Sequence, residues 1–124
     1  MSTKKLTVKD IIKRKDEILN KKNGKKEFYI ESLDANIVCS IPSTDVVLEA
    51  LDMEGREGDY YLIYNSIVEP NLKDAELQSN FELESPIYIV DRIFTPGEIS
   101  SLGLELLKLA GYNDSVKLVN DIKN

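Results

Sequence analysis

The sequence predicts an α+β fold that is mostly α, with one N-terminal β-hairpin at about residues 27–41 and about five or six short helices. Apolar residues recur at helical spacing through most of the chain and alternate with polar residues only near 27–41. The 124 residues, 42% hydrophobic and 31% charged, suffice for one folded core and are too few for two. We therefore expect a single domain, 1–124, with a basic helix and link (1–26), the hairpin (27–41) and a helical body (42–124).

The N-terminal segment combines helical periodicity with basic charge. Residues 7–20, TVKDIIKRKDEILN, predict an amphipathic helix with Thr7 as N-cap and one apolar face, made of Val8, Ile11, Ile12, Ile18 and Leu19. The following KKNGKK is typical of a turn or flexible link. Residues 1–26 hold ten basic and three acidic residues, a net charge of +7, whereas the remaining 98 hold six basic and nineteen acidic, a net charge of −13. This asymmetry indicates a basic arm on an acidic body.

The hairpin rests on two short alternating runs, EFYIES and NIVCSI, on either side of the turn-forming LDAN. A lone two-stranded hairpin is marginal in water, so we expect it to pack on the body or to pair with another chain. Its edges are also candidates for strand addition by a partner.

The first part of the helical body contains three expected helices. Ser43 predicts the N-cap of a helix that ends near Gly55. A second helix, from about Glu57 to Pro70, carries the strongest apolar stripe, Tyr60, Tyr61, Ile63, Tyr64, Ile67 and Val68. A short helix resumes around residues 74–81. The stretch IVEPNLKDAELQ, residues 67–78, is thus interpreted as a joint between two helices, with Asn71 and Asp74 able to cap the second.

Start signals are clearest near the C-terminus. Ser85-Pro86 predicts an N-cap followed by proline at the first helical position. The stretch TPGE, residues 95–98, predicts a second start with a capping box between Thr95 and Glu98. That helix carries Ile99, Leu102, Leu106 and Leu109 and stops at Gly111. A final short helix, SVKLVNDIK, follows.

Composition argues against several classes of function. With no His and one cysteine, Cys39, zinc sites and Ser-His or Cys-His catalysis as usually built are excluded, and we expect no cofactor and no enzymatic activity. Cys39 is interpreted as a small core residue. No apolar run reaches the roughly 20 residues of a membrane span, and MSTKKLTVKD lacks the apolar region of a secretory signal, so we expect an intracellular protein.

Two charged segments have functional readings that compete with structural ones. The acids at 52, 54, 57 and 59 surround two glycines but lack calcium-loop spacing, so we interpret them as a solvated turn. The basic arm is compatible with nucleic-acid binding, but its lysines alternate with acids and the body is acidic, so a solvated helix face is favoured.

Five residues are candidates for contact with a partner protein: Tyr60, Tyr64, Leu102, Leu104 and Leu107. Tyrosines at this spacing are compatible with core packing and also with interface anchors. Leu104 and Leu107 lie off the main stripe of their helix. That helix is therefore either buried between elements or presents one side to another chain.

Three stretches resemble one family: LTVKDIIKRKDEI, VLEALDMEGREGDYYLIYNSIVEPNLKD and PIYIVDRIFTPGEISSLGLELLKLAGY. In their order and spacing, over about residues 6–112, the chain resembles the phage XkdN-like tail assembly chaperones of PBSX-type prophages and related contractile-tailed phages.

The resemblance implies a non-enzymatic protein of the host cytoplasm that coats the tape measure protein and keeps it soluble during tail morphogenesis. It also implies self-association, absence from the mature particle and, in many phages, a longer frameshifted product that contacts the tail tube protein. Nucleic acid and membranes are not expected partners. The alternatives are a structural tail component retained in the virion and a helical protein-binding module of another role.

Overall fold

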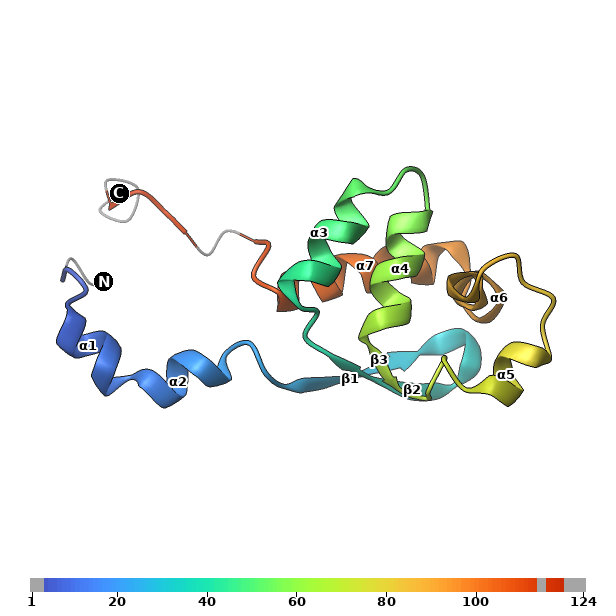
Figure 1. Ribbon diagram of the computed structural model, residues 1–124, viewed down its shortest axis with the longest axis horizontal. Coiled ribbons are helices and arrows are strands. Elements are labelled where there is room, and N and C mark those ends of the chain that lie inside the picture. Colours follow the sequence, from blue (N-terminus) through green and yellow to red (C-terminus); the bar gives the residue numbers. More distant parts are fainter. Residues whose placement is uncertain (1–3, 114–115, 120–124) are drawn as a thin grey trace.

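The computed structural model describes residues 4–113 and 116–119 and has mixed helix and strand (Figure 1). In chain order its elements are α1 (Val8–Lys13), α2 (Lys15–Asn20), β1 (Lys25–Ile30), the 3₁₀ turn η1 (Glu31–Leu33), β2 (Ala35–Ser40), α3 (Thr44–Asp52), α4 (Glu57–Ser66), β3 (Ile67–Glu69), α5 (Ala75–Ser79), the 3₁₀ turn η2 (Pro86–Tyr88), α6 (Ile89–Ile93) and α7 (Pro96–Leu109). The α+β class is confirmed. The described residues contain seven α-helices and three strands, more of each than the sequence predicted.

The predicted hairpin is present and belongs to a larger sheet. β1 and β2 pair antiparallel from Lys25 opposite Ser40 to Ile30 opposite Ala35. The turn between them is η1 followed by Asp34, which has a left-handed backbone (φ 47°). β3 then pairs antiparallel with β2, which gives a three-stranded sheet in the order β1-β2-β3.

The interpretation of residues 67–78 as a joint between two helices is wrong. α4 ends at Ser66, and Ile67–Glu69 form β3, with Ile67 opposite Cys39. Pro70 therefore ends a strand, after a cis Glu69–Pro70 peptide bond. The β-branched Ile67 and Val68 suit a strand, and pairing with β2 overrides the helical pattern that they continue. The second half of the joint is as expected, because Asp74 caps α5 by accepting the Leu77 N–H at 2.9 Å.

The core lies between the sheet and the helices packed on one side of it. In Figure 1, α3, α4 and α7 lie over the sheet, and α4 packs against both other helices. The fully buried large side chains are Ile63, Leu72, Ile89, Ile99, Leu106, Val47, Val90 and Cys39. Residues from β2, α3, α4, α6 and α7 thus form one continuous core.

The predicted N-caps differ in what their side chains do. Ser43 accepts the Val46 N–H, and Thr95 and Glu98 form the predicted capping box at the start of α7. Ser85 makes no capping hydrogen bond, and Pro86 begins the 3₁₀ turn η2 before α6. Proline at the first position is compatible with either kind of helix start.

The N-terminal helix is interrupted where the sequence predicted one continuous helix over 7–20. Thr7 caps α1, as expected, and also forms a capping box with Asp10 that was not predicted. Arg14 leaves helical geometry (φ −101°, ψ 21°) and separates α1 from α2. Neither helix contains a buried residue. Figure 1 shows this segment extending away from the body at the start of β1. We call residues 4–23 the arm.

The C-terminal prediction is confirmed up to Gly111. α7 ends at Leu109, and Gly111 has a positive φ of 95°. Most of the final helix predicted at 115–123 lies outside the described residues. Within it, residues 116–118 are not helical.

Candidate partner-binding surfaces

Tyr60 and Tyr64 lie on α4 and are both partly buried against the core. The Tyr60 hydroxyl donates to Asp91 Oδ1 at 3.1 Å, and its ring meets the Tyr88 ring edge-on at 5.7 Å between centroids. Partial burial and the hydrogen bond to Asp91 raise the pKa of Tyr60. Tyr60 therefore connects α4 to the α6 region.

Tyr64 packs partly on the core and contacts Lys73. Lys73 Nζ lies 5.4 Å from the centroid of its ring, in a cation–π arrangement, and partial burial raises the pKa of its hydroxyl. One side of this tyrosine packs on the core, and the rest faces the turn before α5. A role in partner binding stays a prediction for both tyrosines.

The three candidate leucines of α7 have three different environments. Leu102 is 4% exposed and belongs to the core, and Leu107 is partly buried against it. Leu104 is 60% exposed. The buried residues of α7 are Ile99, Leu102, Gly103 and Leu106, which leaves Leu104 on the solvent side of the helix. Of the three, Leu104 alone presents most of its side chain to a partner.

Two further exposed leucines, which the sequence did not single out, lie on α3. On α3, Val47 and Ala50 are buried, whereas Leu48 and Leu51 are 57% and 60% exposed. With five positions of nine occupied by apolar residues, the pattern was too broad for a single buried stripe, and this excess was the available signal.

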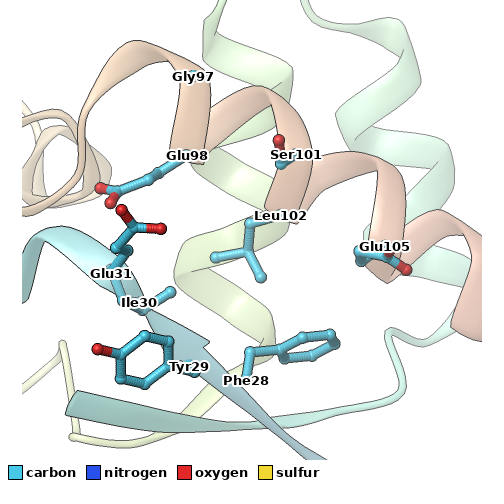
Figure 2. A pocket seen from close by; sticks show the side chains of 9 residues that line it. All are labelled: Phe28, Tyr29, Ile30, Glu31, Gly97, Glu98, Ser101, Leu102 and Glu105. Carbon is cyan, nitrogen blue, oxygen red and sulfur yellow. The ribbon is translucent and has the colours of Figure 1, made fainter. Parts of the chain in front are cut away.

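An apolar groove lies between β1, at one edge of the sheet, and α7. It encloses about 310 Å³ and is lined by Phe28, Tyr29, Ile30, Glu31, Gly97, Glu98, Ser101, Leu102 and Glu105. Figure 2 shows Leu102 pointing from α7 toward the strand that carries Phe28 and Ile30. The floor is therefore hydrocarbon, and we call this feature the β1–α7 groove.

Carboxylates border the β1–α7 groove at both ends. Glu31 and Glu98 lie at one end and Glu105 at the other (Figure 2). Glu98 accepts the Thr95 N–H at 2.9 Å and two donors of Ser32, and these hydrogen bonds lower its pKa, so it is anionic near neutral pH. Glu105 lies 4.0 Å from Lys108. The groove thus joins an apolar floor to a negatively charged rim.

The residues first considered for chemistry have structural roles. Cys39 is fully buried in the sheet, and burial raises the pKa of its thiol to about 11. In the acidic turn, Asp59 lies 3.7 Å from Arg56, and Glu57 accepts the Tyr88 hydroxyl at 2.8 Å. Across residues 4–113 and 116–119, no three His, Cys, Asp or Glu side chains are grouped as a metal site would need. Within the same residues, no helix has the length and apolar character to span a bilayer.

Comparison with known proteins places this sequence in one family. The sequence model of the family described as phage XkdN-like tail assembly chaperone protein, TAC, matches residues 1–123. No curated protein and no solved structure matches the chain. Since the matched region covers all but the last residue, this chain belongs to the phage XkdN-like tail assembly chaperone family.

Proposed function

We propose that this protein binds the tape measure protein of its phage and keeps it soluble until the tail tube assembles around it. The observation that carries the proposal is membership of the tail assembly chaperone family along nearly the whole chain. A tape measure protein is long and helical, so its apolar faces need cover before assembly. Association through such faces requires no bond to be made or broken, and we assign no catalytic step.

Three exposed leucines on helices of the body form the proposed client surface. Leu48 and Leu51 on α3 and Leu104 on α7 are each more than half exposed. A helix that carries apolar residues at intervals of three or four offers a matching stripe to such side chains. The leucines are few and dispersed over the helical body. The chain as a whole has a net charge of −6, and this charge keeps the chaperone itself soluble.

The remaining parts of the proposal concern place and partners. The protein acts in the host cytoplasm during assembly, several copies cover one client, and the chaperone leaves before the particle is complete. A longer product made by frameshifting would bring a second contact, to the tail tube protein. Mass spectrometry of purified particles tests the departure step: stoichiometric retention would instead indicate a structural tail component.

Copurification with a tagged tape measure protein tests the client surface. The variant Leu48→Asp/Leu51→Asp/Leu104→Asp should reduce the amount of chaperone recovered about tenfold or more, because it places charge where apolar contact is proposed. The control Glu49→Gln/Lys108→Gln changes exposed polar positions on the same two helices and should bind normally. Circular dichroism shows whether each variant is folded. Equal recovery of both folded variants would contradict this surface.

Leu107→Asp provides a further check, since this side chain packs partly on the core. It should lower the stability of the chain itself, by about 1–3 kcal/mol, whereas Leu104→Asp should change it by less than about 0.5 kcal/mol. Urea denaturation measures both.

A further inference from the structure

The arm has an apolar surface that the body does not cover. Val8 and Ile12 are 73% and 68% exposed, and Leu6, Ile11 and Leu19 are also exposed. Val8, Ile11 and Ile12 are spaced as neighbours on one side of α1. Isolated helices shorter than about 12 residues are marginal in water. Two six-residue helices with exposed apolar faces therefore gain stability when another surface covers them.

The arm is also strongly basic. Residues 4–23 contain eight basic and three acidic residues, a net charge of +5. Two of its acids are already engaged inside the arm, since Asp10 pairs with Lys4 at 3.3 Å and Glu17 with Arg14 at 2.8 Å. Lys9 and Lys13 are exposed and follow the apolar positions Val8 and Ile12 around the helix. The arm thus offers an apolar stripe bordered by positive charge.

The β1–α7 groove has the complementary character. Its floor of Phe28, Ile30 and Leu102 is apolar, and its rim carries the carboxylates of Glu31, Glu98 and Glu105. A volume of about 310 Å³ is enough for the few apolar side chains that one helical turn presents. Two larger hollows suit a basic apolar segment less well. One, near the arm itself, is lined by Lys21 and Lys22 and would repel a basic segment. The other, beside Tyr60 and Tyr88, carries the two cations Arg56 and Arg92 among its carboxylates and lacks an aliphatic floor.

We propose that the arm of one copy docks in the β1–α7 groove of a second copy, with Val8, Ile11 and Ile12 on the apolar floor. Lys9 and Lys13 then lie near the acidic rim. Apolar burial supplies most of the affinity, and the opposite charges select the orientation.

The exit of the arm favours a second copy over the groove of the same chain. The arm joins β1 at its first residue, Lys25, and the Ile41 N–H donates to Gly24 O at 3.2 Å at this point. The groove lies over the other end of β1, at residues 28–31. In Figure 1 the arm leaves the body in the direction opposite to that in which β1 runs. To reach its own groove, the helical part of the arm would have to reverse direction within residues 21–24, between α2 and β1.

This contact joins two different surfaces, so each copy keeps one free arm and one free groove. A head-to-tail interface of this type forms either a closed ring or an open row of copies. An open row is a suitable arrangement for covering an extended client. The proposed contact itself requires no client, so it can be tested apart from the proposed function.

Charge reversal on the full-length protein tests the contact. The arm variant is Lys9→Glu/Lys13→Glu, and the groove variant is Glu31→Lys/Glu105→Lys. Glu98 is left unchanged because it caps α7. Sedimentation velocity as a function of concentration should show association of the unmodified protein. The affinity of each variant for itself should be lower by a factor of about ten or more. The control Glu49→Lys/Glu76→Lys reverses two exposed charges outside the groove and should retain association.

Mixing the two variants gives the decisive result. Each variant alone carries like charges on arm and groove, whereas a mixture pairs the basic arm of one with the acidic groove of the other, and the reverse. An equimolar mixture should recover association toward that of the unmodified protein. Ile11→Asp/Ile12→Asp should abolish association and leave the thermal midpoint unchanged, since neither residue is buried in the body.

Three outcomes would overturn the proposal. The unmodified protein could stay monomeric at concentrations up to about 100 μM, well above the dissociation constant expected for such a contact. The mixture could fail to associate, which would indicate that the arm binds within its own chain or not at all. Groove variants could lose the client while the unmodified chain stays monomeric, in which case the groove takes a basic segment of the client.

Discussion

Glu98 and Ser32 hydrogen-bond through both oxygens of one carboxylate, although they lie 66 positions apart. Ser32 Oγ donates to Glu98 Oε1 at 3.0 Å, and the Ser32 N–H donates to Oε2 at 3.3 Å. The same carboxylate completes the capping box of α7 by accepting the Thr95 N–H at 2.9 Å. One side chain therefore caps a helix, fastens η1 to the start of that helix and fixes one end of the β1–α7 groove.

Glu98→Gln should reduce the amount of stability that the protein loses as the pH falls. Hydrogen bonds from the Thr95 N–H and from Ser32 lower the pKa of Glu98 below its ordinary 4.5. A carboxylate with a lowered folded-state pKa stabilises the fold above its unfolded pKa, and this contribution is lost as the pH falls through the folded value. Below about pH 4.5, urea denaturation should therefore show a smaller loss of stability in the variant than in the unmodified protein. Parallel pH profiles would contradict this role.

Thr95→Ala and Ser85→Ala should differ, although the sequence marks both residues as N-caps. Thr95 Oγ1 accepts the Glu98 N–H at 3.2 Å, whereas Ser85 makes no capping hydrogen bond. Loss of the first cap should lower the free energy of unfolding by about 1 kcal/mol. Loss of Ser85 should change it by less than about 0.5 kcal/mol. Equal effects in urea denaturation would be inconsistent with these two helix starts.

The start of α7 could be predicted from neighbouring residues, whereas the strand β3 could not, because it depends on pairing with residues far away in the sequence. Thr95, Pro96 and Glu98 specify the start of α7 within four residues, so the capping box could be read from the sequence. Ile67 continues the apolar pattern of α4, and only its pairing with Cys39, 28 positions earlier, makes it a strand residue. Such a contact depends on how the whole chain folds.

The candidate site shows the same division. Periodicity correctly separated the buried Leu102 and Leu106 from Leu104, but it also placed Leu107 off the stripe, although this residue packs partly on the core. The excess of apolar residues on α3 signals that some of them are exposed, but neither the identity of the exposed pair, Leu48 and Leu51, nor the β1–α7 groove could be predicted. Both depend on which faces of α3 and α7 the neighbouring elements cover, and no local pattern records that.

Gly58→Ala should destabilise the protein through a backbone clash. A Cβ at position 58, on α4, would collide with the Ala50 carbonyl oxygen of α3. The helices would have to separate, and we expect a loss of about 1–3 kcal/mol in the free energy of unfolding. Gly97→Ala is the matched control, because nothing lies within 4 Å of the added Cβ and alanine favours the helix. A neutral effect at position 58 would contradict this helix packing.

Cys39 should be nearly inert toward thiol reagents in the folded protein. Its side chain is fully buried, and burial raises the thiol pKa to about 11, so little thiolate exists at pH 8. Reaction with a chromogenic disulfide should be slower than that of a free thiol by roughly two orders of magnitude or more, and urea should restore the ordinary rate. Fast reaction without denaturant would show that this part of the sheet opens readily.

The central claim is that this protein keeps the tape measure protein soluble, and coexpression of the two proteins tests it most directly. The fraction of tape measure protein that stays in the supernatant after centrifugation is measured with the unmodified chaperone, with Leu48→Asp/Leu51→Asp/Leu104→Asp, and with no chaperone. We predict a large soluble fraction in the first case alone. An equal soluble fraction with and without the unmodified chaperone would contradict the proposed function.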